Sequence, residues 1–376
     1  MRILMVCPRF VPDVGGVEGH VYEVARRLVL RGVEVEVLTT DTSGRLAPAD
    51  ALEGIRIRRV GAWPRRSDYR LAPDLVGEIE RAGCDVMHLH SHHTLVAPLA
   101  MAAAVRRGLP FVVTFHGIGH STALRGPLRP AQVALLRPLL ARASRLVALT
   151  DIERDRFTRL ARLPAERFVV IPNGADRLVG AGEGGSLDGP SRVIASIGRL
   201  ERFKGHHRVL AALPRVLARC PDVRLLIVGR GPEERTLRSF ATRVGVAERV
   251  EITSVPLADR RRMAALLMGA RVVALLSEGE GQPLAALEAA ALGRPLLVTY
   301  APGLRQLVDE GIAAGVSLQA SSDDVAAALI RQLEQPLLPT PATVPAWDGC
   351  VDALMGAYAS AARGDTASRF RNGSPA

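Results

Sequence analysis

The sequence predicts an α/β protein of two Rossmann-like domains, each with a doubly wound parallel sheet, facing each other across a cleft. Three observations support this fold class. The chain has 376 residues, which suits two domains of roughly 150–200 residues each. Short apolar runs alternate with helical patterns almost throughout, and this alternation is typical of parallel sheets covered by helices on both faces. A glycine-rich stretch separates two rounds of the alternation.

The first round occupies residues 1–173, which we assign to an N-terminal domain. Its apolar runs are predicted strands, and the segments between them carry the helical spacing of apolar residues. The predicted strands are 2–7, 33–39, 55–60, 85–90, 110–114, 145–149 and 167–171. The predicted helices are 17–31, 71–82, 94–106, 131–142 and 151–161.

Residues 174–190 are predicted to link the domains, because they are rich in glycine and poor in apolar residues. The second domain is assigned to residues 191–346, and its last twelve residues are proline-rich. Its predicted strands are 192–198, 222–228, 249–252, 271–276, 295–299 and 313–318.

A last helix is predicted over residues 347–361, followed by a disordered tail over 362–376. The helical spacing places several large apolar side chains on one face. They are Trp347, Val351, Leu354, Met355 and Tyr358.

Composition favours a globular protein, since 48% of residues are hydrophobic and 23% are charged. No apolar run approaches the roughly 20 residues of a membrane helix, and the first apolar run is too short for a signal peptide. We therefore expect a cytoplasmic protein. The four cysteines lie far apart, without metal-ligand or redox spacing, which indicates reduced structural thiols.

The net charge of +11 favours anionic partners. Only 4% of residues are aromatic and none interleave with basic ones, which argues against nucleic acid as the partner. An anionic membrane surface is a second hypothesis, with peripheral contact at the inner face, because five arginines flank apolar stretches. They are Arg125, Arg129, Arg137, Arg142 and Arg145.

The most informative motif runs from Gly198 to Gly205, after one predicted strand and before a helix. Glycine lets the backbone approach a ligand closely, and a helix N-terminus favours anions. Arg199 can contact a phosphate through two nitrogens, and Lys204 offers a point charge. Lys204 is also the single lysine among 49 basic residues, which suggests a position that requires one.

A second motif runs from Glu280 to Glu288 and contains Gly281, Gln282, Pro283 and Leu284. It follows the predicted strand 271–276, and Pro283 suits the first turn of a helix. Two carboxylates eight residues apart can face the same cleft and accept hydrogen bonds from the hydroxyls of ribose or hexose. Glu278 competes with Glu280 for the role of the loop carboxylate.

Two features of the N-terminal half complete the candidate site. Gly15 and Gly16 follow the first strand and open a helix, so they can line a ligand, although the full dinucleotide fingerprint is not present. His116 follows the strand 110–114, where an imidazole can donate a hydrogen bond to a sugar hydroxyl or a leaving phosphate.

Histidines also gather at positions 88, 90, 92 and 93. His88 and His90 share one strand face. We expect packing, or, for His90 and His92, a place on the acceptor side of the cleft, rather than a metal site. No Asp-x-Asp pair is present to hold a divalent ion on a diphosphate, so cationic side chains must supply that charge.

With these motifs, the chain resembles glycosyltransferase family 4, whose members are retaining enzymes of the GT-B fold. The matching segments are 15–18, 172–176, 198–205, 225–232 and 280–295. The glutamate pair is similar to that family's E-x7-E signature. The resemblance covers the chain from Met1 to about Tyr358 and implies that the first domain binds the acceptor and the second a nucleotide-sugar donor.

The resemblance also implies individual roles. Arg199 and Lys204 would bind the donor diphosphate, with Gly198 and Gly16 close to phosphate. Glu288 would hold the ribose and Glu280 the donor sugar, while His116 would contact a sugar hydroxyl. The helix 347–361 would cross back onto the first domain.

These observations predict a retaining glycosyltransferase that moves a sugar from a nucleotide diphosphate sugar to a hydroxyl of a glycan, lipid or small molecule. No cofactor or metal is expected. Two alternatives are a nucleotide-sugar epimerase or phosphorylase on the same scaffold, and a non-catalytic sugar-nucleotide-binding protein.

Overall fold

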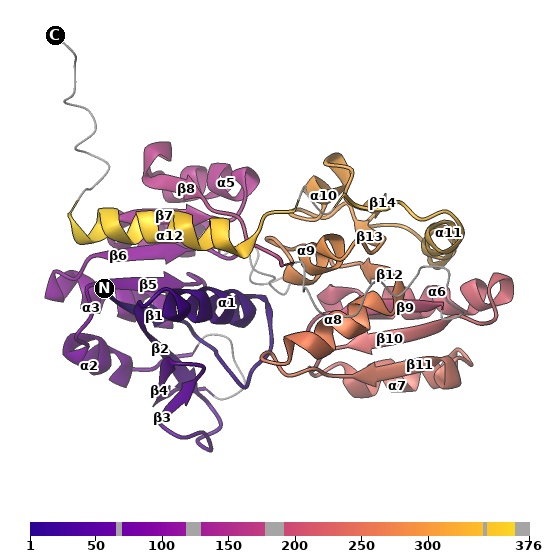
Figure 1. Cartoon of the computed structure of the whole chain (residues 1–376), viewed down its shortest axis with the longest axis horizontal. Coiled ribbons are helices and arrows are strands. Elements are labelled where there is room, and N and C mark those ends of the chain that lie inside the picture. The colour runs from indigo at the N-terminus through magenta and orange to yellow at the C-terminus, as the bar shows by residue number, and fades with distance from the viewer. Residues whose placement is uncertain (65–69, 118–128, 177–191, 341–343, 365–376) are drawn as a thin grey trace, which may run out of the picture. The chain divides into compact units, whose positions relative to one another are not determined.

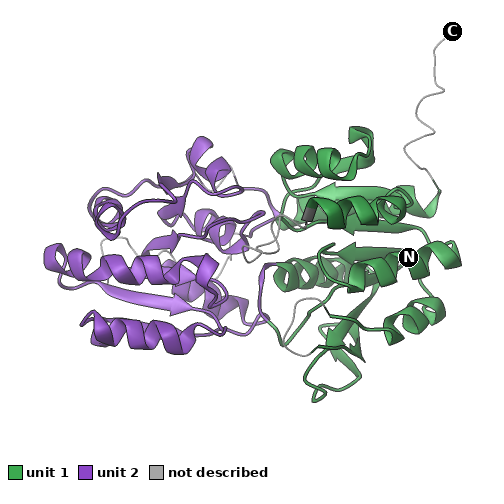
Figure 2. Ribbon diagram, turned by 180° about the vertical axis from the view of Figure 1, so that it is seen from behind, with its two compact units in different colours: residues 1–13, 17–173, 347–376 green, residues 14–16, 174–346 purple. Residues whose placement is uncertain are grey.

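The computed structural model describes residues 1–64, 70–117, 129–176, 192–340 and 344–364. The chain divides into two compact units (Figure 2). Unit 1 comprises Met1–Asp13, Val17–Asn173 and Trp347–Ala376, and unit 2 comprises Val14–Gly16 and Gly174–Ala346.

Within the described part of unit 1, eight strands form one sheet in the order β3-β4-β2-β1-β5-β6-β7-β8 (Figure 1). Every pairing is parallel except that of β3 with β4. The strands are β1 (Arg2–Val6), β2 (Glu34–Asp41), β3 (Ala49–Leu52), β4 (Ile55–Gly61), β5 (Val86–His90), β6 (Phe111–Thr114), β7 (Arg145–Ala148) and β8 (Phe168–Val170). The antiparallel β3 lies outside the sequence-based expectation.

Helices cover both faces of this sheet. Their bounds are α1 (Gly16–Leu30), α2 (Asp74–Arg81), α3 (Val96–Arg107), α4 (Arg129–Leu140), α5 (Asp151–Ala161) and α12 (Trp347–Ala362). One apolar core joins α2, α3, α4 and α5 to the sheet. The sequence of a strand such as β1 is almost entirely apolar, because a central strand of a parallel sheet is buried on both faces.

The C-terminal helix α12 packs against β5 and β6 in unit 1 (Figure 1). Trp347 and Tyr358 are fully buried, and the hydroxyl of Tyr358 lies 2.6 Å from Nδ1 of His88. Arg31, just after α1, forms ion pairs with Asp348 and Asp352. Helix α12 thus returns to the unit that contains the beginning of the chain.

In unit 2, six described strands form a parallel sheet in the order β11-β10-β9-β12-β13-β14. They are β9 (Val193–Ile197), β10 (Arg224–Val228), β11 (Val250–Thr253), β12 (Ala270–Leu275), β13 (Leu296–Thr299) and β14 (Ala314–Val316). Two apolar cores, one on each face, join the sheet to its helices. The helices are α6 (His206–Arg219), α7 (Glu234–Arg243), α8 (Arg260–Met268), α9 (Leu284–Ala291), α10 (Arg305–Asp309) and α11 (Ser322–Glu334).

Candidate active site

The order of strands in unit 2 locates the first part of the site. From β9 the chain runs outward to β10 and β11 on one side, and from β12 to β13 and β14 on the other. The sheet therefore changes direction between β9 and β12, and ligands of open α/β sheets bind beyond the carboxyl ends of strands at such a point. The loops that follow β9 and β12 are those that carry the two sequence motifs.

Lys204 and Glu280 connect these two loops. Nζ of Lys204 lies 2.6 Å from Oε1 of Glu280, and Oγ of Ser277 donates to the same oxygen at 2.7 Å. The side chains of Lys204 and Glu280 are 18% and 14% exposed, so the pair is sheltered but reachable from solvent. The structure thus brings together one residue from each of the two motifs predicted in unit 2.

Glu280, and not Glu278, makes this contact. Glu278 is exposed, and its backbone amide donates to the carbonyl of Phe203 at 2.8 Å. This backbone bond also connects the two loops, so Glu278 contributes through its main chain. The structure therefore places Glu280 beside Lys204.

Glycines allow the two loops to approach each other. Gly205 has φ +76°, and a Cβ there would lie 2.1 Å from the carbonyl oxygen of Leu276. The loop after β13 also approaches the β12 loop closely, since a Cβ on Gly303 would lie 2.3 Å from the carbonyl oxygen of Glu280. Any side chain at either position would push the backbone of the β12 loop away, so these glycines set the place of Glu280.

His206 holds the loop after β9 in shape. It is buried at the start of α6, with Nδ1 2.8 Å from Oγ of Ser196 and Nε2 3.2 Å from the carbonyl oxygen of Arg199. Nε2 must carry the proton in order to donate to that carbonyl, and Nδ1 then accepts from the serine. Burial lowers the pKa of His206 to about 4, so the ring is neutral at neutral pH.

Arg199 and Arg260 of unit 2 are also paired with carboxylates. Nη1 of Arg199 lies 2.9 Å from Oε1 of Glu201, and Arg260 at the start of α8 forms an ion pair with Glu288 on α9. Arg199, Lys204 and Arg260 are each next to a carboxylate, so an incoming diphosphate would compete with these carboxylates for the cations. Gly281, Gln282 and Pro283, between Glu280 and α9, are partly exposed, as is Leu284, the first residue of α9. Pro283 is the N-cap of this helix.

Unit 1 has a corresponding change of direction, between β1 and β5. Gly15 and Gly16 follow β1 along the chain but are grouped with unit 2, and Gly16 is the exposed first residue of α1. A Cβ on Gly16 would meet no atom within 4 Å, so the backbone there is accessible to a ligand. His90 is the last residue of β5, next to this point.

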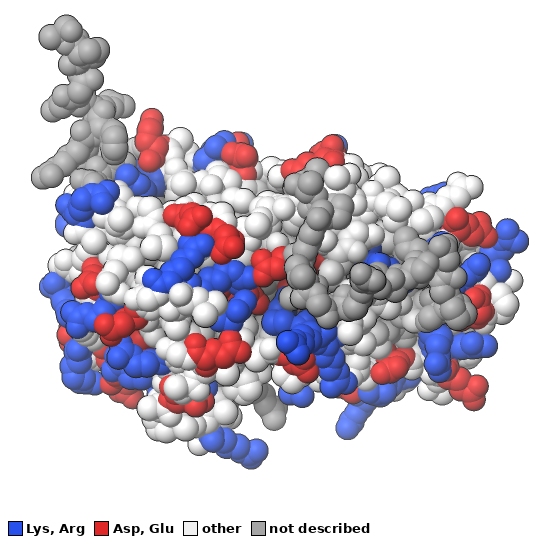
Figure 3. Space-filling model, in the orientation of Figure 1, with Lys and Arg blue, Asp and Glu red and all other residues white. Residues whose placement is uncertain are grey.

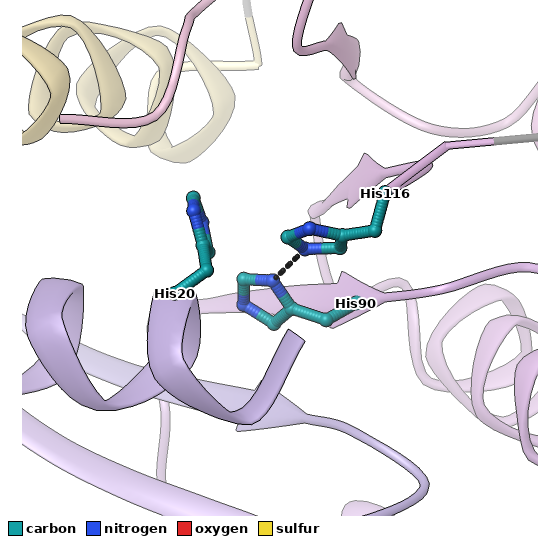
Figure 4. Close-up of side chains that lie close together, drawn as sticks. All are labelled: His20, His90 and His116. Carbon is teal, nitrogen blue, oxygen red and sulfur yellow. Dashed lines mark hydrogen bonds between the residues drawn. The ribbon is translucent and has the colours of Figure 1, made fainter. Parts of the chain in front are cut away.

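His116 lies two residues after β6 with φ +57°, a conformation that few non-glycine residues adopt. Its Nε2 is 3.0 Å from Nδ1 of His90 (Figure 4). The buried carboxylate of Glu153 accepts hydrogen bonds from the amides of Gly117 and Leu149, which anchors the segment after His116. Burial raises the pKa of Glu153 to about 7, although both amide donors oppose the shift.

His92 has a different environment. It is buried, and its ring contacts are with His93, Phe115 and Phe157, at centroid distances of 5.9, 5.2 and 4.8 Å. The ring contacts of His90, by contrast, are with His20, His88 and His116. The structure therefore groups His90 with His116 and places His92 in an aromatic cluster.

Known families match both halves of the chain. The model described as Glycosyltransferase Family 4 matches residues 14–177, and that described as Glycosyl transferases group 1 matches residues 191–335. A GDP-mannose:cellobiosyl-diphosphopolyprenol alpha-mannosyltransferase of Xanthomonas oryzae pv. oryzae is 33% identical over 340 residues, which are 87% of each chain. This chain belongs to glycosyltransferase family 4.

Another relative in the family is D-inositol 3-phosphate glycosyltransferase 1 of Catenulispora acidiphila. It is 29% identical over 388 residues, which are 94% of this chain and 92% of that protein. Both relatives are named as glycosyltransferases, so the present family 4 member is an enzyme of that class.

Solved structures show the fold of this glycosyltransferase to be GT-B. Sucrose-phosphate synthase from Thermosynechococcus elongatus has a TM-score of 0.73 at 18% identity and covers 96% of this chain and 98% of its own. HepE of Anabaena, in complex with UDP and glucose, has a TM-score of 0.67 at 19% identity and covers 98% of this chain and 96% of its own.

Several residues of this glycosyltransferase were missed by the sequence analysis. Arg260, His206, His20 and Glu153 lie at the site or hold its loops, yet none belongs to a motif that could be read from spacing. The described helices of this enzyme include none that is both long and apolar enough to cross a membrane. Its four cysteines are free thiols, as their spacing predicts.

Proposed function

We propose that this glycosyltransferase transfers a sugar from a nucleotide diphosphate sugar to an acceptor hydroxyl, with retention of anomeric configuration. The observation that carries the proposal is the contact of Lys204 with Glu280 across the two loops of unit 2. It combines a cation that suits a diphosphate with a carboxylate that suits sugar hydroxyls. Both residues lie in loops that follow the carboxyl ends of strands, and ligands of open α/β sheets bind at that edge.

In the proposed reaction, Lys204 and Arg199 bind the donor diphosphate, with the backbone of Gly198 beside it. Glu280 and Glu288 accept hydrogen bonds from hydroxyls of the donor sugar and the ribose. Gly16 approaches a phosphate, and His116 donates to a sugar hydroxyl. Partner carboxylates release the two cations when the diphosphate binds, because phosphate oxygens form strong charge-assisted bonds with them.

The bond between the anomeric carbon and the diphosphate oxygen breaks, and the acceptor oxygen attacks from the same face. The departing diphosphate takes the acceptor's proton, so no carboxylate nucleophile is needed. Stabilising the negative charge on that diphosphate is the largest catalytic contribution, and cationic side chains supply it without a metal ion.

Lys204 permits a direct test, because it is the single lysine of the chain. The amines open to an acetylating reagent are those of Lys204 and the N-terminus, and peptide mass spectrometry separates these two sites from each other and from any other acetylated side chain. We expect a bound nucleotide diphosphate to slow the acetylation of Lys204 and leave that of the N-terminus unchanged. Equal rates with and without nucleotide would contradict the proposal.

The donor can be identified by thermal shift with UDP-, GDP-, ADP- and TDP-sugars, because a ligand that binds the folded state raises its unfolding temperature. GDP-mannose belongs in this panel, since the Xanthomonas relative is named for it.

Acceptors to test with the stabilising donor are a diphosphopolyprenol-linked oligosaccharide and an inositol phosphate, after the named relatives. The anomeric configuration of the product, read by NMR, tests retention. Free sugar, sugar phosphate or an epimerised donor as the main product would favour the alternative activities.

We also propose peripheral contact with an anionic membrane at the inner face. Acidic and basic side chains are interspersed on the face drawn in Figure 3, so the surplus charge is not gathered into one patch there. Helix α4 supports the contact better, because Leu135 is 80% exposed near the exposed Arg137 and Arg142. Arg145 instead bonds to Ser144 and Ser360, and Arg125 lies outside the described residues.

Flotation with vesicles of anionic lipid tests this contact. We expect salt-sensitive binding that Leu135→Glu weakens, while Leu338→Glu, at a 53% exposed leucine of unit 2, leaves binding intact. Equal flotation of both variants, or no flotation of the native protein, would refute the contact.

A further inference from the structure

Three histidines from separate elements of unit 1 meet at one place. His20 lies on α1, His90 ends β5, and His116 follows β6 (Figure 4). One ring nitrogen can be chosen from each so that all three lie within 4.8 Å of one another. The strand order brings them together, because β1 and the following α1 lie beside β5, and β5 lies beside β6.

The ring nitrogens of this cluster are not all satisfied. Nδ1 of His20 lies 2.7 Å from Oδ1 of Asn173, so Nδ1 carries the proton and Nε2 keeps its lone pair. Within the described part of the chain, Nε2 of His20 is buried and has no hydrogen-bond partner. Buried polar atoms without partners are costly and rare, so each requires an explanation, such as a bound ion.

We propose that His20, His90 and His116 form a binding site for a divalent transition-metal ion of the zinc type. Nδ1 of His90 and Nε2 of His116 share a hydrogen bond of 3.0 Å, and the ion would displace the proton between them. Two ligands at tetrahedral zinc are about 3.3 Å apart for bonds of about 2.05 Å, so only a small adjustment is needed. The amide oxygen of Asn173 fixes the ring of His20, as outer groups do for metal-bound histidines.

His88 is not a ligand, although its ring lies 3.9 Å from that of His90. Its two nitrogens are within 2.6 Å of the Tyr358 hydroxyl and 2.7 Å of Oγ1 of Thr114. The site therefore has three protein ligands, and a fourth tetrahedral position is left for water or a substrate oxygen. Three-ligand sites of this kind are typical of reactive rather than structural zinc.

This site is chemically distinct from the proposed handling of the diphosphate. Imidazole nitrogens select zinc, nickel, cobalt or copper, whereas the magnesium that accompanies diphosphates prefers oxygen ligands. The side chains of Arg199 and Lys204 in unit 2 remain the proposed partners of the diphosphate. The proposed metal site goes beyond sugar transfer, and metal binding can be measured without any donor or acceptor.

The experiment uses the untagged full chain after treatment with a chelator. Titration with Zn²⁺ in a calorimeter should show one equivalent bound, and Co²⁺ at the same site should give the intense visible absorption of tetrahedral cobalt. His20→Gln should weaken binding by at least about 100-fold, because loss of an outer partner alone costs about 10–100-fold. His207→Gln, at a half-buried histidine of unit 2, is the matched control and should bind as the native protein does.

His116→Asn is the second ligand variant, since asparagine tolerates the positive φ of that position. It keeps the proposal testable if His20→Gln fails to fold, and circular dichroism shows which variants are folded. Thiol titration confirms that the four free cysteines are not the ligands. The proposal is overturned if the native protein binds no stoichiometric Zn²⁺, or if folded His20→Gln and His116→Asn bind it as tightly as the control does.

Discussion

Nζ of Lys204 lies 2.6 Å from Oε1 of Glu280, although 76 positions separate the two residues. Each side chain comes from a loop at the carboxyl end of a central strand of unit 2, one after β9 and the other after β12. The pair therefore depends on the sheet order and on the close backbone packing at Gly205. Its two charges suit the two halves of a nucleotide diphosphate sugar, which leads to separate predictions for the cation and the carboxylate.

Removal of the cation should slow the reaction strongly. We expect Lys204→Ala to lower turnover by about 10²-fold or more, because single donors to a developing negative charge contribute that much. Lys204→Arg keeps the charge but not the compact ammonium, and should recover only part of the activity. Steady-state rates with the donor identified by thermal shift provide the measurement. Near-native turnover of Lys204→Ala would remove this residue from the mechanism.

The two neighbouring carboxylates should respond differently. Glu280→Gln should reduce turnover by at least about 10-fold, because it removes a charged acceptor of the kind whose hydrogen bonds contribute about 1.5–3 kcal/mol. Glu278→Gln is the matched control and should leave turnover nearly native, since that side chain is exposed. Comparing kcat and KM of the two variants checks this. A larger loss in Glu278→Gln than in Glu280→Gln would reverse the assignment.

The sequence alone was sufficient to predict those parts of the candidate site that depend on residues close together along the chain. Lys204 and Glu280 each follow an apolar strand and lie near glycines, and the parallel sheet brings such loops to one edge. The C-terminal helix was likewise visible, since its apolar residues recur with helical spacing. These elements could be predicted because each depends on residues close together along the chain.

Other features depend on packing between distant elements and were not foreseen. The ion pair of Arg260 with Glu288 requires α8 and α9 to lie side by side, and His20 was indistinguishable from other residues of a regular helix. Strand β3, with the sequence Ala-Asp-Ala-Leu, has little strand propensity and forms only through its pairing with β4. The spacing of residues along the sequence does not predict contacts of these kinds.

We predict that position 205 requires glycine because a side chain would not fit there, and not only because the backbone has a positive φ. Gly205→Ala should destabilise the protein by several kcal/mol, because a Cβ would lie 2.1 Å from the carbonyl oxygen of Leu276. Gly245→Ala is the matched control, since Gly245 has φ +73° and open space around its Cβ position, and should cost about 1 kcal/mol. Denaturant unfolding of both variants gives the comparison. Equal losses would mean that φ alone, rather than the contact with the β12 loop, requires glycine at position 205.

The loop after β9 should also be sensitive to acid through His206. Its pKa falls from 6.5 in the unfolded chain to about 4 in the folded protein, chiefly because burial disfavours the charged ring. The unfolded state therefore binds a proton that the native state does not, so this contribution to stability is present above pH 6.5 and is lost as the pH falls toward 4.

His206→Gln isolates this effect from the other buried histidines, which are the same in both proteins. At pH 7.5 the variant should be less stable than the native protein by about 1–3 kcal/mol, because polar atoms of Ser196 and Arg199 lose their partner. The difference should shrink steadily between pH 6.5 and 4, since only the native protein has this ring to protonate. Urea unfolding at several pH values measures it. A difference that stays constant over that range would show that the imidazole of His206 is not held neutral by burial, and the loop would then owe its shape to hydrogen bonds that protonation leaves intact.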